Sequence, residues 1–184
     1  MILYGSTTSP YVRHCRLVLL LNQDEFVLQE TDLSQSANLS PSKKIPFLKS
    51  GDIALSDSTT ILRFLREQHQ QVFLKDLSDH DLFCLISTLM DSAINVFYLE
   101  KEGLTLDKAQ YLERQHQRVL DGLNYLESYC PNAVDWHNDY HLRLAIFLDW
   151  GLFRQRFNLD RHPQLQAFLN RAKENADFLA CSPQ

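Results

Sequence analysis

The spacing of apolar residues changes near residue 75. Before that point, short apolar runs typical of strands alternate with a segment of helical spacing over residues 10–22, and a second helix is predicted from Ser58. The stretch IPFLKSGDIALSDS predicts a hairpin, and the polar residues 34–44 predict a loop with room for one helical turn. This order predicts a mixed sheet, because a strand-helix-strand unit favours parallel pairing and a hairpin is antiparallel. The strands are expected at residues 2–4, 26–28, 47–49 and 53–55.

The remainder of the chain is predicted to be helical. Residues 79–101 keep apolar side chains at helical spacing, and Gly103 marks the end of that helix. The segment 140–157 is so apolar that we expect it to be the buried centre of this half. The sequence therefore divides into a domain over residues 1–75, a linker over 76–78 and an all-helical domain over 79–184. The helices expected in the second domain are 79–101, 106–129, 140–157 and 162–173.

Charge and composition narrow the possible functions. The net charge is −5 and no run of basic residues is present, which argues against a nucleic-acid-binding surface. No uninterrupted apolar stretch approaches the roughly 18 residues of a membrane span, and no signal peptide is visible, so we expect no membrane contact. The four cysteines are far apart and have no clustered histidines near them, which predicts reduced thiols, no metal site and a cytoplasmic protein.

Hydroxyl side chains gather at residues 6–9, in the stretch YGSTTSPYVRHCR between the first strand and the first helix. Ser9 followed by Pro10 is a favourable N-cap and first-turn pair, so helix capping accounts for one hydroxyl. The alternative is an anion bound at the helix start, where free backbone N–H groups and the helix dipole attract negative charge. The residues themselves leave both interpretations open.

Two further stretches pose related questions. In KKIPFL, Pro46 lies where a strand begins, which is a position that tolerates proline. In LSDSTTILRFL, Asp57 and Ser58 lie at the start of a helix, where they can cap it or help to bind an anion. A carboxylate beside an anion site favours a ligand that also carries an ammonium group, as the α-amino acid end of a peptide does.

In this order, SPYVRHCR, LSPSKKIPFL and LSDSTTILRFL, followed by a helical half, resemble a cytosolic glutathione S-transferase. The nearest resemblance is to bacterial members with a Ser-Pro-Tyr/Phe-Val-Arg stretch, and MDSAINVFYLEKE resembles their fourth helix. The resemblance covers nearly the whole chain. It implies an α+β fold, with an N-terminal thioredoxin-like domain (βαβ-ββα, mixed four-stranded sheet) and an all-α C-terminal domain. It also implies that the bond before Pro46 is cis.

The resemblance also implies which residues bind glutathione as co-substrate. Ile45, before the cis Pro46, would contact the backbone of the cysteinyl residue. Asp57 and Ser58 would bind the γ-glutamyl end. The glycyl carboxylate would be met by a basic residue near the proline, Lys44 or Lys43.

The glutathione sulfur would face Ser9 or Thr8, with Ser6 and Thr7 as further alternatives. A capping serine uses its oxygen as an acceptor, so its proton can be donated to a thiolate. A charge-assisted hydrogen bond of about 1.5–3 kcal/mol and a helix dipole of about 0.3–1 kcal/mol could together lower a thiol pKa by one to two units. No separate catalytic base is then needed. Cys15, further along the helix, is expected to be a buried core thiol.

The implied function is conjugation or reduction of a small hydrophobic electrophile by glutathione, in detoxification. The pocket for the electrophile would be lined by Tyr11, Asp91, Asn95 and Tyr98, for which packing or surface positions are the alternative. A second possible function is that of a non-catalytic binding protein of the same fold, like the stringent-starvation proteins that bind RNA polymerase. We also expect a homodimer, because the apolar faces of residues 58–70 and 79–101 are too extensive for one small core.

Overall fold

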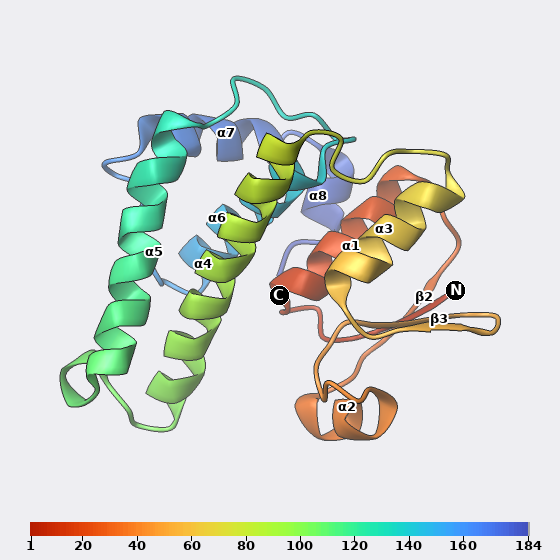
Figure 1. The fold of residues 1–184 in the computed structure, drawn as a ribbon, viewed down its shortest axis with the longest axis horizontal. Helices are drawn as coiled ribbons and strands as arrows, with labels where there is room; N and C mark the ends of the chain where they lie inside the picture. The colour runs from red at the N-terminus through yellow and green to blue at the C-terminus, as the bar shows by residue number, and fades with distance from the viewer. Residues whose placement is uncertain (184) are drawn as a thin grey trace. The chain divides into compact units, whose positions relative to one another are not determined.

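The computed structural model describes residues 1–183 and contains two compact units. The first consists of Met1–Phe73 together with the C-terminal residues from Lys173, and the second is Leu74–Ala172. Figure 1 shows the elements of both units.

The first unit is built on a mixed four-stranded sheet in the order β2-β1-β3-β4. The parallel pair β1–β2 and the antiparallel pairs β1–β3 and β3–β4 confirm the predicted thioredoxin-like fold. Helices α1 and α3 lie side by side on one side of the sheet, and α2 lies on the other side (Figure 1). The elements are β1 (Ile2–Tyr4), α1 (Pro10–Leu21), β2 (Val27–Gln29), α2 (Leu33–Leu39), β3 (Phe47–Ser50), β4 (Ile53–Leu55) and α3 (Ser58–Gln68).

Helix α2 lies where the sequence predicted a loop with room for a single helical turn. It begins with a capping box: the Asp32 carboxylate accepts the N–H of Gln35 at 2.8 Å, and the Gln35 side chain accepts the N–H of Asp32 at 3.2 Å. The N–H of Gln35 is also the main reason why the pKa of Asp32 is lowered. The segment carries no run of apolar residues, and the signal at the start of the helix is a capping box of polar side chains, so the apolar pattern did not reveal the full length of the helix.

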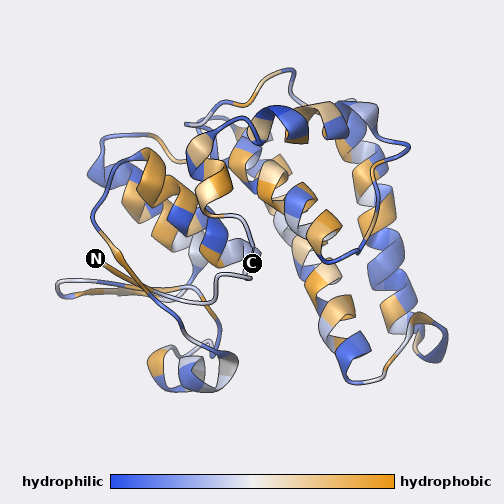
Figure 2. Ribbon diagram, turned by 180° about the vertical axis from the view of Figure 1, so that it is seen from behind, coloured by the Kyte–Doolittle hydropathy of each residue, from blue (hydrophilic) through white to orange (hydrophobic). Residues whose placement is uncertain are grey.

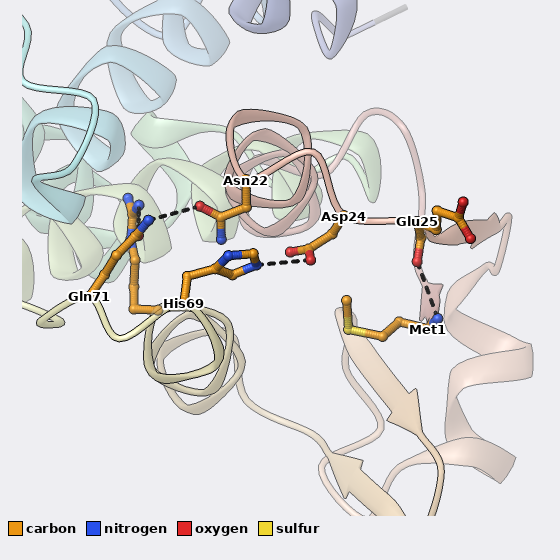
Figure 3. A network of polar contacts seen from close by, with 7 residues as sticks. Met1, Asn22, Asp24, Glu25, His69 and Gln71 are labelled. Carbon is orange, nitrogen blue, oxygen red and sulfur yellow. Dashed lines mark hydrogen bonds and ion pairs between the residues drawn. The ribbon is translucent and has the colours of Figure 1, made fainter.

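Side-chain hydrogen bonds join the carboxyl ends of α1 and α3. Nε2 of His69, the C-cap residue of α3, lies 2.9 Å from Oδ1 of Asp24 (Figure 3). Gln71 donates from Nε2 to Oδ1 of Asn22, the C-cap residue of α1, at 3.2 Å. These contacts hold the two helices together at the end opposite to their N-termini.

The C-terminal residues pack on α1 of the first unit through a short helix, α8 (Ala176–Ala180). The Arg13 side chain, only 1% exposed, donates to the carbonyl of Phe178 at 3.2 Å and to Oγ of Ser182 at 3.3 Å. Its guanidinium carbon lies 4.3 Å from the centroid of the Phe178 ring. The sequence division had placed residues 173–184 in the helical domain, since a five-residue helix is too short to show which unit its apolar side chain enters.

The second unit is helical, as predicted. Its longest helices are α4 (Leu77–Lys101) and α5 (Gln110–Ser128), and apolar and polar residues alternate along its helices (Figure 2). Helix α6 (Asp139–Phe153) is the buried centre, with every residue from Leu142 to Gly151 buried. The remaining elements are the 3₁₀ turn η1 (Leu106–Lys108) and α7 (Pro163–Ala172).

Helix α6 ends four residues earlier than the apolar pattern predicted. The chain reverses after Phe153, with Gln155 at a φ of 54°. Phe157 then folds back onto the helix, where a Cβ at Gly151 would lie 2.1 Å from Cζ of the Phe157 ring. The apolar residue that extended the predicted helix therefore packs against it from a loop.

Helices α4 and α6 run parallel. At their N-termini, Asn138 donates from Nδ2 to Oδ2 of Asp79 at 2.7 Å, and at their C-termini Arg156 forms an ion pair with Glu100. The start of α6 is capped by Asn138, whose Oδ1 accepts the N–H of Tyr140 at 3.0 Å. Nδ1 of His141 accepts the N–H of Asp135 at 2.9 Å, and burial lowers the pKa of this histidine, so the neutral ring fits the acceptor role.

Helix α4 is long and apolar enough to cross a membrane by length and composition alone, with a mean hydropathy of 1.6 over 18 residues. Central helices of globular domains pass the same test, and 39% of this window is buried. Polar residues interrupt this segment, so no continuous apolar run in the sequence marks it.

Candidate functional site

The strand register brings three connections to one edge of the sheet. Tyr4, the last residue of β1, pairs with Phe47, the first of β3. Leu55, the last residue of β4, pairs with Leu48. The turn into α1, the loop before β3 and the connection into α3 therefore lie together, although up to fifty residues separate them in the chain. This edge is the candidate functional site.

At this edge Ser9 caps α1. Its Oγ accepts the N–H of Val12 at 3.4 Å, and its carbonyl accepts the N–H of Arg13 at 2.9 Å. Because the cap uses the oxygen as an acceptor, the Ser9 proton can still be donated to a ligand, and no described residue accepts it. Thr8 lies beside it, with Oγ1 at 3.2 Å from Oγ of Ser6. The hydroxyl cluster is therefore partly bonded within itself.

The turn is held tightly against the rest of the first unit. The N–H of Gly5 donates to the carbonyl of Gln29 at 3.1 Å, and a Cβ at Gly5 would lie 2.3 Å from Cγ2 of the buried Val12. The N–H of Thr7 points to the Glu30 carboxylate, at 3.3 and 3.4 Å from its oxygens. Sequence reasoning missed Glu30, which follows β2 and reaches the turn only because β2 is parallel to β1. Its carboxylate occupies the N–H of Thr7, so that group is not open to a ligand anion.

The loop before β3 contains the cis peptide bond between Ile45 and Pro46, as the resemblance implied. Pro46 is buried and Ile45 is half-buried. The backbone N–H and carbonyl of Ile45 form no hydrogen bond with the described residues, so both are available to an extended ligand. Lys43 and Lys44 are exposed, and the Lys43 carbonyl accepts Oγ–H of Ser36 in α2 at 3.1 Å. Helix α2, which lies where the sequence predicted a loop with room for one helical turn, thus positions this loop.

Asp57 is the N-cap residue of α3. One carboxylate oxygen, Oδ1, accepts the N–H groups of Thr59 at 2.8 Å and Thr60 at 3.3 Å. The other oxygen, Oδ2, forms no hydrogen bond with the described residues. Asp57 therefore caps the helix through Oδ1, and Oδ2 can accept a hydrogen bond from a ligand. Ser58, the first residue of the helix, is 7% exposed.

The four residues expected to line a second-substrate pocket lie on different units. Tyr11 is half-buried on α1 of the first unit. Asp91, Asn95 and Tyr98 are exposed on one face of α4 in the second unit, at the helical spacing i, i+4, i+7. A common pocket for the four residues stays a prediction.

The cysteines of the chain are free thiols. Cys15 is fully buried, as predicted, and Cys84 is exposed. Burial raises the pKa of Cys130 to about 11, and it also raises the pKa of Cys181. These last two thiols are therefore not activated nucleophiles. Among residues 1–183, no group of three or more His, Cys, Asp or Glu side chains is arranged to hold a metal ion.

Comparison with known proteins identifies the family to which the domain in the first unit belongs. Residues 3–73 match the family model of the glutathione S-transferase N-terminal domain. This part of the chain is a glutathione S-transferase N-terminal domain. The match agrees with the predicted family over this part of the chain, and the three connections of the candidate site all lie within it. No curated protein matches the sequence.

Solved glutathione S-transferases share the fold over the whole chain. One from Methylobacillus flagellatus, with glutathione bound, is 21% identical with a TM-score of 0.86, covering 100% of this chain and 99% of its own. One from Methylobacterium radiotolerans, in complex with glutathione sulfonate, is 19% identical with a TM-score of 0.87, covering 99% and 94%. A glutathione transferase family member from Pseudomonas fluorescens, with bound S-(propanoic acid)-glutathione, is 26% identical with a TM-score of 0.81, covering 100% of both chains.

Proposed function

We propose that the protein is a glutathione transferase that binds glutathione at the sheet edge of its first unit. The observation that carries the proposal is the meeting of three features at this edge: the capped start of α1, the cis bond before Pro46 and the half-free carboxylate of Asp57. Each is a weak signal alone. Their combination in a glutathione S-transferase N-terminal domain supports a site for a peptide with an ammonium group, a free backbone and a thiol.

In this proposal each part of glutathione has its own partner. The ammonium of the γ-glutamyl residue meets Oδ2 of Asp57, and its carboxylate meets Ser58 and the start of α3. The cysteinyl backbone pairs with the open N–H and carbonyl of Ile45. The glycyl carboxylate meets Lys44 or Lys43. The domain division, with residues 1–75 as the glutathione-binding domain, is part of the same proposal.

The chemical step needs a thiolate. We place the sulfur at the start of α1, where the Ser9 hydroxyl, or that of Thr8, donates to it and the helix dipole favours its charge. The thiol proton leaves to solvent, and the thiolate forms a carbon–sulfur bond with a small electrophile, which either loses a leaving group or gains a proton. Tyr11, Asp91, Asn95 and Tyr98 are the proposed pocket residues for the electrophile, and detoxification in the cytoplasm is the expected context.

Titration calorimetry of the full chain with reduced glutathione tests this proposal. We expect saturable binding of one glutathione per chain, and turnover with a generic aryl halide in the presence of glutathione. Glycine and free cysteine, which lack most of the proposed contacts, serve as controls and are expected not to bind measurably. Absence of glutathione binding would refute the proposal and favour the non-catalytic alternative of the stringent-starvation type.

We also propose that the protein is a homodimer through the outer face of α4 and α5. A groove of about 830 Å³ runs between these helices, lined among others by Cys84, Leu85 and Tyr125. The apolar window of α4 is only 39% buried, and Leu77 at the start of that helix is 85% exposed. A second copy that covers this face would remove apolar surface from water, which is the usual driving force of such interfaces.

Light scattering at micromolar concentration tests the dimer. We expect a mass of twice the 21.5 kDa chain. Thr88→Arg, which places a bulky charge in the groove, is expected to give the monomer. Thr105→Arg, at an exposed position outside the groove, is the matched control and should remain dimeric. A monomeric wild-type protein, or a dimeric Thr88→Arg variant, would contradict this interface.

A further inference from the structure

Three cationic side chains surround the ring of Phe97 at the carboxyl ends of α4 and α6. Nζ of Lys101 lies 4.6 Å from the ring centroid, and the guanidinium carbons of Arg154 and Arg156 lie 4.8 and 5.6 Å from it. Cations at such distances are attracted to the face of an aromatic ring. Phe97 itself packs edge-on against Trp150, with ring centroids 6.2 Å apart. The cations therefore gather at a fixed aromatic platform.

Only one of these three charges is neutralised. Arg156 forms an ion pair with Glu100 and donates from Nε to the carbonyl of Arg154 at 2.7 Å. Lys101 and Arg154 form no ion pair with any residue of the described chain. An excess of positive charge therefore remains at this point of the second unit, in a protein whose net charge is −5.

The Arg154 guanidinium is held in one orientation. Its carbon lies 4.8 Å from the centroid of Phe153 as well as from that of Phe97, and its Nε is buried without a hydrogen-bond partner. Its two terminal nitrogens form no hydrogen bond within the described residues and are not buried. The planar fork of donors is thus presented to solvent, which is the geometry that binds a carboxylate with two parallel hydrogen bonds.

The helix dipole does not account for this arrangement. Lys101 is the last residue of α4 and Arg154 is the C-cap of α6, so both positive charges are favoured by the helix ends. A dipole, however, needs neither an aromatic platform nor a buried Nε. Lysines that extend freely into water would interact with the helix dipole equally well.

We propose that Arg154 and Lys101 bind the anionic group of an aryl carboxylate. The carboxylate lies in the fork of Arg154 with Lys101 close by, and the aromatic ring of the ligand stacks on Phe153, which is 43% exposed. The chemical class of the ligand is an aromatic carboxylic acid. As the second substrate of a transferase, such an acid rests on the function proposed above, whereas the anion subsite itself does not.

The position of the cluster favours the second substrate over glutathione as its ligand. All groups proposed to bind glutathione lie in the first unit, including Lys44 for its carboxylate. The cluster lies in the second unit, and the Phe97 ring contacts the ring of Tyr98, with centroids 5.5 Å apart. Tyr98, the next residue of α4, is one of the residues proposed for the electrophile pocket, so the cluster adjoins the part of that proposed pocket that α4 would contribute.

Calorimetry with 1-naphthoate and its uncharged analogue 1-naphthamide tests the proposal on the full chain. We expect the wild type to bind naphthoate at least tenfold more tightly than naphthamide. Arg154→Met should weaken naphthoate binding tenfold or more and leave naphthamide binding within about twofold, since a hydrogen bond to a charged group of typical strength corresponds to at least that factor. Lys101→Met should have a smaller effect of the same sign. Arg161→Met, which removes an exposed charge elsewhere in the second unit, is the matched control and should bind like the wild type.

Glutathione binding distinguishes this proposal from the function itself. Glutathione affinity is expected to be unchanged in Arg154→Met. A loss of glutathione affinity in that variant, with naphthoate binding retained, would assign the cations to glutathione and overturn the proposal. Equal binding of naphthoate and naphthamide by the wild type, or no naphthoate binding at millimolar concentration, would also overturn it.

Failure of the wild type to bind glutathione would refute the transferase while naphthoate binding still reports on the subsite. Arg154→Lys, which keeps the charge without the fork, gives a second test if the methionine variant does not fold, and it should bind naphthoate more weakly than the wild type.

Discussion

Replacement of Ser9 by alanine is expected to slow conjugation by roughly thirtyfold, with little change in glutathione affinity. The Ser9 oxygen already accepts the N–H of Val12 as the cap of α1, so its proton is the group that can stabilise a thiolate. The loss of one charge-assisted hydrogen bond of about 2 kcal/mol corresponds to that rate factor. Affinity should persist, because glutathione is held mainly through its two ends.

The ultraviolet absorbance of the thiolate, followed against pH in the glutathione complex, measures this effect directly. In Ser9→Ala the pKa of the bound thiol should rise by about one to two units. Thr8→Ala is the alternative assignment, and whichever variant raises the pKa identifies the donor. Thr7→Ala tests a remaining alternative, and Ser78→Ala, which removes an exposed hydroxyl from the second unit, is the control.

Loss of the cap itself is a separate effect. Ser9→Ala should reduce the free energy of unfolding by about 1 kcal/mol, so rates must be compared well below the unfolding temperature. An unchanged thiol pKa and unchanged turnover in both the Ser9 and Thr8 variants would show that the hydroxyl cluster serves only to cap and shape the turn. The thiolate would then depend on backbone N–H groups and the helix end alone.

Asp57→Asn is expected to weaken glutathione binding by roughly tenfold to a hundredfold while leaving the fold intact. Asparagine caps a helix as well as aspartate does, so Oδ1 can still accept the N–H groups of Thr59 and Thr60. The variant loses the charge-assisted hydrogen bond between Oδ2 and the ligand ammonium. A hydrogen bond between charged groups contributes about 1.5–3 kcal/mol to binding. Calorimetry measures the affinity, and thermal unfolding confirms that stability is retained.

A glutathione analogue without the γ-glutamyl amino group completes a double-mutant cycle between Asp57 and the ligand ammonium. If Asp57 receives the ammonium, the analogue should bind the wild type about as weakly as glutathione binds Asp57→Asn, and the double change should add little further loss. Asp52→Asn, at an exposed carboxylate in the turn of the hairpin, is the matched control. Equal affinities of the wild type and Asp57→Asn for glutathione would reduce Asp57 to a helix cap.

Signals carried by neighbouring residues made most strands and helices of the first unit predictable. The pattern of short apolar runs placed β3 and β4, and Ser9-Pro10 and Asp57 marked the starts of α1 and α3, because strand and cap signals are carried by neighbouring residues. The long helices of the second unit followed from apolar residues at helical spacing. Helix α2 was predicted only as a loop with room for one helical turn, because it begins with the Asp32–Gln35 capping box and no run of apolar residues follows.

The sequence by itself thus determined most of the elements and the residue types of the candidate site, and its resemblance pointed to the family. Only the tertiary structure decided which groups meet. The strand register brought Glu30 to the N–H of Thr7, α8 placed Phe178 beneath Arg13, and the parallel course of α4 and α6 gathered Lys101 and Arg154 around Phe97. Apart from Lys101 and Phe97, which are neighbours on α4, these contacts join residues 23 to 165 positions apart. They depend on how whole elements pack, and nothing in the local pattern of apolar and polar residues records that packing.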